Sequence, residues 1–253
     1  MEINNYKEKP KFSVAIKQDA YKNLINNTLG DKELAREFIA NISGVVSNNY
    51  ALQKCDAGSI ISAGLTASSL KLPLTSTLGF CYVIPYGSKA QFQIGWKGLV
   101  QLAIRSGQYS SIGCDVIKEG EYVGRDKTTG EPLFNFSDNI DVNAKTIGYY
   151  AYLKLVNGFT KVIYWSVEKC KEHAKKYSKS YGNGSSTDNW TTQFDTMALK
   201  TVLKQLISKW GIMSVDLQNA ITKDQAVIKD DGTTEYVDND DSIDIDTTAP
   251  TEE

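Results

Sequence analysis

Cationic side chains spaced four residues apart in two segments are the residues best suited to bind a charged partner. Lys97, Gln101 and Arg105 recur at i, i+4 and i+8, so they share one face if their segment is helical. Lys200 and Lys204 repeat the pattern opposite a stripe of apolar residues. A face of this kind suits the phosphates of a nucleic acid. Two ordinary amphipathic helices with solvated lysines would show the same spacing, so that alternative stays open.

Aromatic residues lie beside these cations. Trp96 directly precedes the first cationic face, and Trp190 begins the second segment after a polar loop. A further loop around Gly87 presents a ring, Tyr86, and a cation, Lys89, together. Aromatic rings stack on nucleobases, which makes these positions candidates for base contact. The alternatives are an ordinary surface turn and tryptophans that belong to the hydrophobic core.

The motifs of the common enzyme classes are missing from the sequence. The dipeptide Gly-Lys does not occur, so there is no P-loop, and neither GxGxxG nor GxSxG is present. The single histidine, His173, lies in a polar run that suits no catalytic triad. No Asp/Glu-x-Lys triplet occurs, which weakens a metal-dependent nuclease but leaves a dispersed site open. We expect no catalytic residue, no metal ion and no cofactor.

The cysteines and the distribution of apolar residues indicate the cellular compartment of the protein. Cys55, Cys81, Cys114 and Cys170 are far apart, form no CxxC pair and are expected to be buried free thiols. Free thiols are typical of a reducing compartment such as a cytosol. Residues 1–11 resemble no signal peptide, and no stretch approaches eighteen uncharged apolar residues. We therefore expect a cytoplasmic protein that has no contact with a membrane.

The charge of the chain is divided unevenly. The net charge is −2, but residues 224–253 contain eleven acidic groups against Lys229 alone. Residues 1–223 carry 27 basic and 19 acidic side chains, a surplus of eight positive charges. A basic body with an acidic tail fits a polyanion binder, and Arg125 and Lys127 in a Gly/Thr-rich turn extend its candidate contacts. A solvated surface with a disordered solubility tail explains the same counts.

The elements that must position these residues follow from hydrophobic periodicity. The predicted helices cover 31–46, with Asp31 as N-cap, then 56–70, 95–105, 167–178 and 190–210. A hairpin is predicted over 78–94, with a loop of more than two residues around Pro85 to Ser88. Strand-like runs follow at 112–118, 121–123, 133–136, 147–156 and 161–165, the last two joined by the turn Asn157-Gly158.

This order of elements predicts an α+β fold, in which an antiparallel β-meander and hairpins are flanked by helices. We expect three parts: an N-terminal arm at 1–30, a core at 31–223 and an acidic disordered tail at 224–253.

Three stretches of the chain together resemble the RecT family of phage and prophage annealing proteins. The first joins LKLP at 70–73 to LGFCYVIPYG at 78–87, and Lys71 stands where the family often has glycine. The second runs from IGWKGL at 94–99 to RSG at 105–107, and the third runs from Trp190 to Trp210. Their order and spacing agree over roughly residues 35–215, so the resemblance covers most of the chain.

The resemblance implies binding of single-stranded DNA and annealing of complementary strands in homologous recombination, without ATP. It also implies a homo-oligomer, either ring or helical filament, that holds the annealed duplex. Its expected partners are a phage exonuclease and the single-strand-binding protein of a bacterial host. The acidic tail is expected either to meet a partner or to compete with DNA, and competition predicts tighter binding after truncation at Lys223.

Two other classes of protein remain as alternatives to this interpretation. A metal-dependent nuclease would cleave labelled strands, and a basic adaptor protein would show no affinity for DNA at about 50–150 mM salt.

Overall fold

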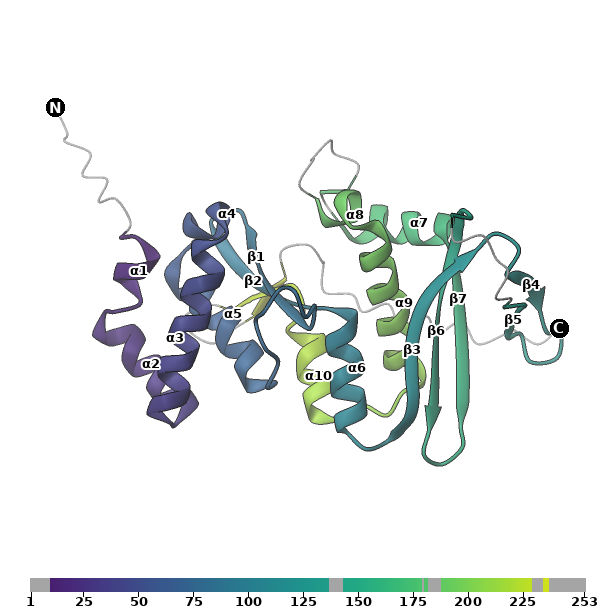
Figure 1. Cartoon of the computed structure of the whole chain (residues 1–253), viewed down its shortest axis with the longest axis horizontal. Coiled ribbons are helices and arrows are strands. Elements are labelled where there is room, and N and C mark those ends of the chain that lie inside the picture. Colours follow the sequence, from purple (N-terminus) through teal and green to yellow (C-terminus); the bar gives the residue numbers. More distant parts are fainter. Residues whose placement is uncertain (1–9, 137–142, 179, 182–187, 229–233, 237–253) are drawn as a thin grey trace.

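The computed structural model describes residues 10–136, 143–178, 180–181, 188–228 and 234–236. Helices and antiparallel strands form an elongated molecule, with helices at one end and a sheet at the other (Figure 1). This is the predicted α+β class.

The N-terminal end is a group of helices: α1 (Phe12–Ala15), α2 (Asp19–Leu29), α3 (Lys32–Ser47), α4 (Tyr50–Gln53) and α5 (Ala57–Ser69). As predicted, Asp31 caps α3, because its carboxylate accepts hydrogen bonds from Glu33 N and Leu34 N at 2.7 and 2.9 Å. Phe38 and Ile42 of α3 are buried against Gly64 of α5, where a Cβ atom would collide with the Phe38 ring. A glycine thus lets these two helices approach closely.

A β-hairpin follows, made of β1 (Cys81–Tyr86) and β2 (Lys89–Ile94). Tyr86 pairs with Lys89, so the loop contains two residues, and the prediction of a longer loop was wrong. Pro85 lies within β1, opposite Ala90. Ala90 and Pro85 exchange no ladder hydrogen bonds, because the Ala90 N–H points away from β1 and donates to the hydroxyl of Ser59 in α5, at 2.9 Å. Proline fits there because the ladder needs no N–H from this position.

The other end is a three-stranded sheet in the order β3 (Tyr109–Lys118), β6 (Thr146–Leu155), β7 (Thr160–Ser166). The Asn157-Gly158 turn joins β6 to β7 as predicted. The small hairpin of β4 (Tyr122–Arg125) and β5 (Pro132–Phe134) lies at the extreme end of the molecule (Figure 1). Alternate residues of β6, among them Tyr149 and Leu153, are buried.

The long helix α9 (Phe194–Trp210) packs on this sheet and on α6 (Trp96–Arg105). The predicted helix over 190–210 is in fact two helices, because Gln193 leaves the helical conformation between α8 (Asn189–Thr192) and α9. Helix α7 (Val167–Tyr177) packs against β6 and β7, and α10 (Val215–Thr222) packs against α6.

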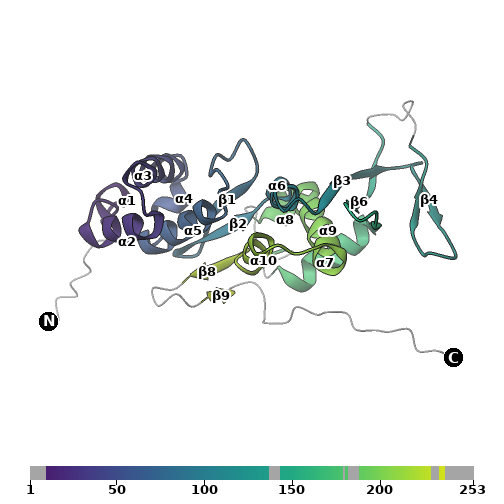
Figure 2. The same ribbon diagram turned by 90° about the horizontal axis from the view of Figure 1, so that it is seen from below.

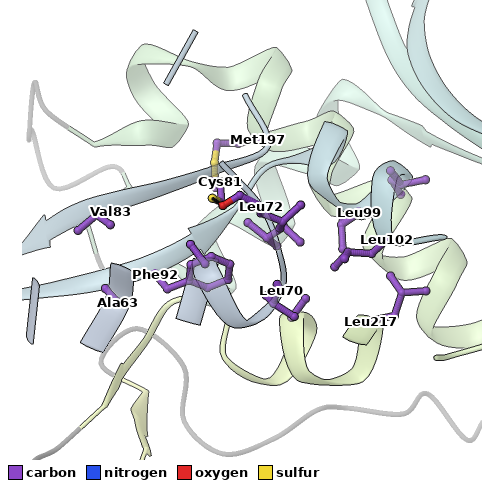
Figure 3. Packing of buried hydrophobic residues seen from close by; sticks show 14 of the residues in the cluster. Ala63, Leu70, Leu72, Cys81, Val83, Phe92, Leu99, Leu102, Met197 and Leu217 are labelled. Atoms are coloured by element: carbon purple, nitrogen blue, oxygen red, sulfur yellow. Dashed lines mark hydrogen bonds between the residues drawn. The ribbon is translucent and has the colours of Figure 1, made fainter. Parts of the chain in front are cut away.

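One hydrophobic core connects the two ends of the molecule. Leu70 and Leu72, from the segment after α5, lie between the hairpin residues and the residues of α6 and α10 (Figure 3). This segment turns through a Schellman motif, in which Leu72 N donates to Ala67 O at 3.0 Å and Lys71 N donates to Ser68 O at 2.9 Å. Lys71 adopts the left-handed conformation with φ 53°, which explains why glycine suits this position.

Buried residues lie on both sides of the two predicted domain boundaries. Phe12, Ile16 and Ile25 belong to the main core although they precede residue 31. At the other end, Asp224 is buried and Gln225 N donates to Phe92 O in β2, at 2.9 Å. The short strand β8 (Ala226–Ile228) runs beside β2 and pairs with β9 (Thr234–Tyr236) (Figure 2). The division into arm, core and tail stays a prediction, and most of 224–253 lies outside the described residues.

Candidate nucleic-acid interface

The three stretches that resemble the RecT family meet at one pocket, although the third lies far from the other two in the sequence. The pocket has a volume of about 320 Å³ and lies where the β1–β2 hairpin, the start of α6 and the helices α8 and α9 come together. These elements supply all of its lining residues, which are Tyr82, Ile84, Gln93, Ile94, Gly95, Trp96, Asn189, Gln193, Thr196, Met197 and Lys200.

Glycines bring the start of α6 against the entry to β1. Gly95 N donates to Phe80 O at 2.9 Å, and a Cβ atom at Gly95 would collide with the carbonyl oxygen of Gly79. A Cβ atom at Gly98 would collide with Phe80 O in the same way. Glycine is therefore needed at both positions for this close approach, and the approach fixes Trp96 in the wall of the pocket.

Amide side chains form the polar part of the lining. Gln93 is buried, its Nε2 atom contacts Met197 Sδ at 3.6 Å, and its Oε1 atom accepts from Asn189 Nδ2 at 3.4 Å. Gln91 lies two residues earlier on the same face of β2 and pairs with Ile84, which lines the pocket. Within the described part of the chain, the buried Nε2 atom of Gln91 has no hydrogen-bond partner.

The lining residue Lys200 belongs to a buried ion pair. Lys200 Nζ lies 2.8 Å from one carboxylate oxygen of Asp224, and Lys204 Nζ lies 3.2 Å from the other. The Asp224 carboxylate also accepts from Ile94 N at 3.1 Å, just before α6. The carboxylate therefore ties α9 to the end of β2 through two cations and one backbone donor.

The ion pair corrects the prediction that Lys200 and Lys204 face solvent. Only 5% of Lys200 is exposed, because the segment that carries Asp224 covers this side of α9. The Lys204 side chain keeps an exposed fraction of 29%, but its ammonium is committed to the same carboxylate. Helical spacing alone could not reveal this covering, since the partner lies twenty or more residues further along the chain.

The pKa shifts of this cluster follow from its burial. Burial would raise the pKa of Asp224, but the two ammonium groups and their hydrogen bonds outweigh it and hold this pKa below its ordinary value. Burial lowers the pKa of Lys200, and Asp224 opposes that shift. We take the pair to be ionised, because the carboxylate has three donors that stabilise its charged form.

The predicted cations of the first face have different surroundings. Lys97 is exposed and lies over the Trp96 ring, with Nζ 5.7 Å from the ring centroid, whereas Gln101 is half-buried. Arg105 donates to Leu70 O at 2.9 Å and to Lys71 O at 3.0 Å. Its guanidinium therefore holds the end of α5, and its i+8 spacing from Lys97 does not make it a free cation.

The remaining candidates do not gather at the pocket. Lys89 is exposed at the hairpin turn, next to the half-buried Tyr86. Arg125 donates to Gly130 O at 2.9 Å, and with the exposed Lys127 it lies in the β4–β5 hairpin at the far end of the molecule (Figure 1). These two cations are remote from the pocket.

Trp190 is a core residue, so the prediction that its ring is available for stacking was wrong. It is 6% exposed and lies in a cluster of rings with His173, Tyr181 and Phe194. The polar loop before it gave the opposite impression, because Asp188 caps α8 and starts the helix directly at the core. Of the two predicted tryptophans, Trp96 is the one that lines the pocket.

Sequence reasoning missed the amide side chains and Asp224. Gln91 and Gln93 alternate with apolar residues in a buried strand, which was the available signal for the amides. Asp224 was counted with the acidic tail, and nothing in its neighbourhood marks it as different from the acids that follow.

The described part of the chain shows no sign of a metal site or a membrane span. No group of three or more His, Cys, Asp or Glu side chains there is arranged to hold a metal ion. None of the helices described is long and apolar enough to cross a membrane. The four cysteines are free, and all but the half-buried Cys114 are buried, as expected.

Fold and site together define a class of protein: an α+β binding protein with a pocket of aromatic and amide side chains beside an exposed lysine. Residues 36–240 match the model of the RecT family. The chain is 43% identical over 205 residues to an uncharacterized protein, YqaK, of Bacillus subtilis strain 168, covering 81% of this chain and 67% of that protein. It is 32% identical over 184 residues to the protein RecT of Escherichia coli strain K12, covering 69% and 65%.

The chain therefore belongs to the RecT family, as its three motifs predicted. The matched region spans about two thirds of the length of each of these relatives.

Proposed function

We propose that this protein binds single-stranded DNA and anneals complementary strands in recombination without using ATP. The observation that carries the proposal is the meeting of the three family stretches at one pocket, with Lys97 exposed beside it. Membership of the RecT family supports the same function.

The mechanism needs binding without sequence preference. Exposed cations such as Lys97 and Lys89 neutralise phosphates, which are the same for every sequence. Most base edges then stay open, and Watson–Crick pairing with a second strand, rather than the protein, selects the partner. Such binding weakens steeply as the salt concentration rises.

We further propose that the protein works as a homo-oligomer, either ring or helical filament. Many weak phosphate contacts then act together along one strand. The partners that the family suggests are an exonuclease that supplies single strands and the host single-strand-binding protein.

The function is tested by mixing two complementary labelled oligonucleotides with the protein, without nucleotide, and following their pairing by energy transfer. We expect pairing faster than in buffer alone, at about 50–150 mM salt. A protein that binds no strand in this range would be a basic adaptor. Strands shortened in the presence of Mg²⁺ or Mn²⁺ would instead indicate a nuclease.

Lys97 gives a sharper test of where the phosphates lie. Lys97→Ala is expected to weaken binding of single-stranded DNA several-fold and to reduce the salt dependence by about 0.7 in the log–log slope, since one phosphate contact is lost. Lys32→Ala, at an exposed position at the start of α3, is the matched control and should change neither quantity. Equal effects of the two substitutions would place the phosphates elsewhere.

Lys200 and Lys204 do not serve for such a test. Changing both to alanine leaves the buried carboxylate of Asp224 without its cations. Weaker pairing by that variant would then report on folding as much as on DNA contact.

A further inference from the structure

We propose that the pocket between the β1–β2 hairpin and the helices α8 and α9 receives one unstacked nucleobase of the bound strand, while the phosphates stay outside. This inference rests on the proposed function and adds to it the part of the strand that the pocket takes.

The size of the pocket suits a single ring system. Its volume of about 320 Å³ is near the lower end of the range of about 300–1,000 Å³ in which proteins bury small ligands. Tyr82 and Trp96 supply aromatic groups to its wall, and Ile84 and Met197 supply apolar ones. Aromatic and apolar surfaces of this kind bind the faces of nucleobases regardless of sequence.

The polar groups of the pocket match the edge of a base. Gln93, Asn189 and Gln193 each carry an amide, and Thr196 adds a hydroxyl. An amide offers a donor and an acceptor side by side, which is the arrangement that pairs with two neighbouring atoms of a base edge. Rotation of an amide by a half turn exchanges the donor and the acceptor, so the same residues can serve different bases.

These amides also have hydrogen-bonding capacity to spare. The contact between Asn189 Nδ2 and Gln93 Oε1 is long, at 3.4 Å. Among the described residues, Gln93 Nε2 donates only to the sulfur of Met197, which is a weak acceptor. Gln91 lies on the same face of β2 but is not one of the lining residues, and its buried Nε2 atom has no partner among the described residues. Buried polar groups are almost always paired, so a ligand with donors and acceptors in the pocket would complete the pairing of Gln93 and Asn189.

The charge of the pocket disfavours a phosphate. Lys200 is the only ionisable cation among the described lining residues, and its ammonium is 2.8 Å from Asp224. The carboxylate is 1% exposed and already holds both Lys200 and Lys204. A phosphate in the pocket would place a second anion near Asp224 and would find no free cation among the described lining residues. An uncharged base would meet neither penalty. Lys97, outside the pocket, is free to take the phosphate.

One base held per subunit has a consequence for annealing. The held base is removed from the stack and cannot pair until it leaves the pocket, whereas its neighbours remain open for pairing. Each subunit thereby binds the strand through one base in the pocket as well as through phosphates outside it.

The experiment compares two strands of equal length and charge, one of thymidines and one entirely of abasic sites. We expect the wild-type protein to bind the strand with bases about tenfold more tightly, as the stacking of a single base allows. The double variant Gln193→Ala/Thr196→Val should lose most of this ratio and keep its affinity for the abasic strand. Thermal unfolding checks that this variant is folded.

A second measurement uses the wild-type protein alone, with 2-aminopurine placed at each position of a strand in turn. Fluorescence should change on binding at recurring positions and change less at the positions between them, because the held base exchanges its stacked neighbours for the aromatic wall of the pocket. Equal affinity for the two strands, or an equal loss on both strands in the double variant, would overturn the base pocket. If the protein anneals complementary strands but binds the thymidine strand and the abasic strand with equal affinity, only this inference fails. If neither strand is bound, the proposed function fails with it.

Discussion

Asp224 is buried, whereas its neighbours Lys223 and Gln225 are only partly buried. It lies in the interior with an exposed side-chain fraction of 1%, and it holds Lys200 and Lys204 together with the backbone of Ile94. A buried ion pair adds little stability compared with apolar residues that fill the same space, but removal of one partner is costly. Asp224 therefore matters mainly because its loss would leave the buried Lys200 without a counter-charge.

Asp224→Asn tests this arrangement. We expect the free energy of unfolding to fall by about 3–5 kcal/mol, because Lys200 then stays buried without a counter-charge. Lys204→Ala should cost much less, since the side chain of Lys204 is 29% exposed and Lys200 still pairs with Asp224. Urea unfolding of both variants gives the comparison, and equal losses would contradict the assigned roles.

His173 makes the stability of the protein depend on pH. Burial, with Lys204, Lys176 and Lys169 nearby, lowers its pKa to about 4. The unfolded chain therefore binds a proton near pH 6.5, whereas the folded chain does so only near pH 4. Between these values stability is lost as the pH falls, by at most about 1.4 kcal/mol per pH unit.

His173→Phe removes this dependence and keeps a ring among Trp165, Tyr177 and Trp190. We expect the stability of the variant against urea to be nearly independent of pH from about 6.5 to 4. It should fall only below that, where the Asp224 carboxyl takes up a proton in the unfolded chain more readily than in the folded protein. An unchanged profile would mean that His173 is not the group responsible.

At the scale of elements, the segment between α5 and β1 joins the two ends of the molecule. It turns through the Schellman motif at Lys71, Leu70 and Leu72 enter the common core, and Arg105 of α6 holds the carbonyl groups of Leu70 and Lys71. The LKLP and RSG motifs thus meet at one joint, although more than thirty residues separate them in the sequence.

Lys71→Gly should stabilise this joint. The left-handed conformation costs a side-chain-bearing residue about 1–2 kcal/mol, and glycine adopts it freely, with part of the gain lost to the greater freedom of the unfolded chain. We expect a net gain of about 0.5–1 kcal/mol by thermal unfolding. Lys22→Gly, inside α2, is the control and should lose about 1 kcal/mol. A loss at both positions would contradict the conformation at Lys71.

At the scale of the whole molecule, an elongated body ends in a strongly acidic segment. Residues 237–253 contain seven carboxylates and no lysine or arginine, so a chain of residues 1–236 has a net charge of +5 instead of −2. If this segment competes with DNA for the cations, its removal strengthens binding. The burial of Asp224 shows that a cut at Lys223 is unsuitable, because it would also remove the partner of Lys200.

Truncation after Tyr236 separates the two effects. We expect the shortened protein to unfold at nearly the same temperature and to bind single-stranded DNA more tightly, with the largest gain at low salt. Truncation after Lys223 should instead lower the unfolding temperature. Equal or weaker DNA binding by the 1–236 chain would exclude competition and leave contact with a partner as the role of the segment.

The sequence by itself determined the type and order of most elements and the family. Asp31 caps its helix and Asn157-Gly158 forms its hairpin as predicted, because caps and turns depend on residues close together in the chain. The motifs indicated the RecT family for a related reason, since each of them is a pattern of residues that lie close together in the chain.

Only the tertiary structure decided which of these residues share a site. It buried Lys200 and Trp190, paired Asp224 with Lys200 in the interior, and joined Gln93, Trp96 and Asn189 in one pocket. A helical pattern predicts that a face is polar, but whether that face meets water or a distant carboxylate depends on contacts across many residues. Those contacts are fixed by packing of the whole chain, which local periodicity does not contain.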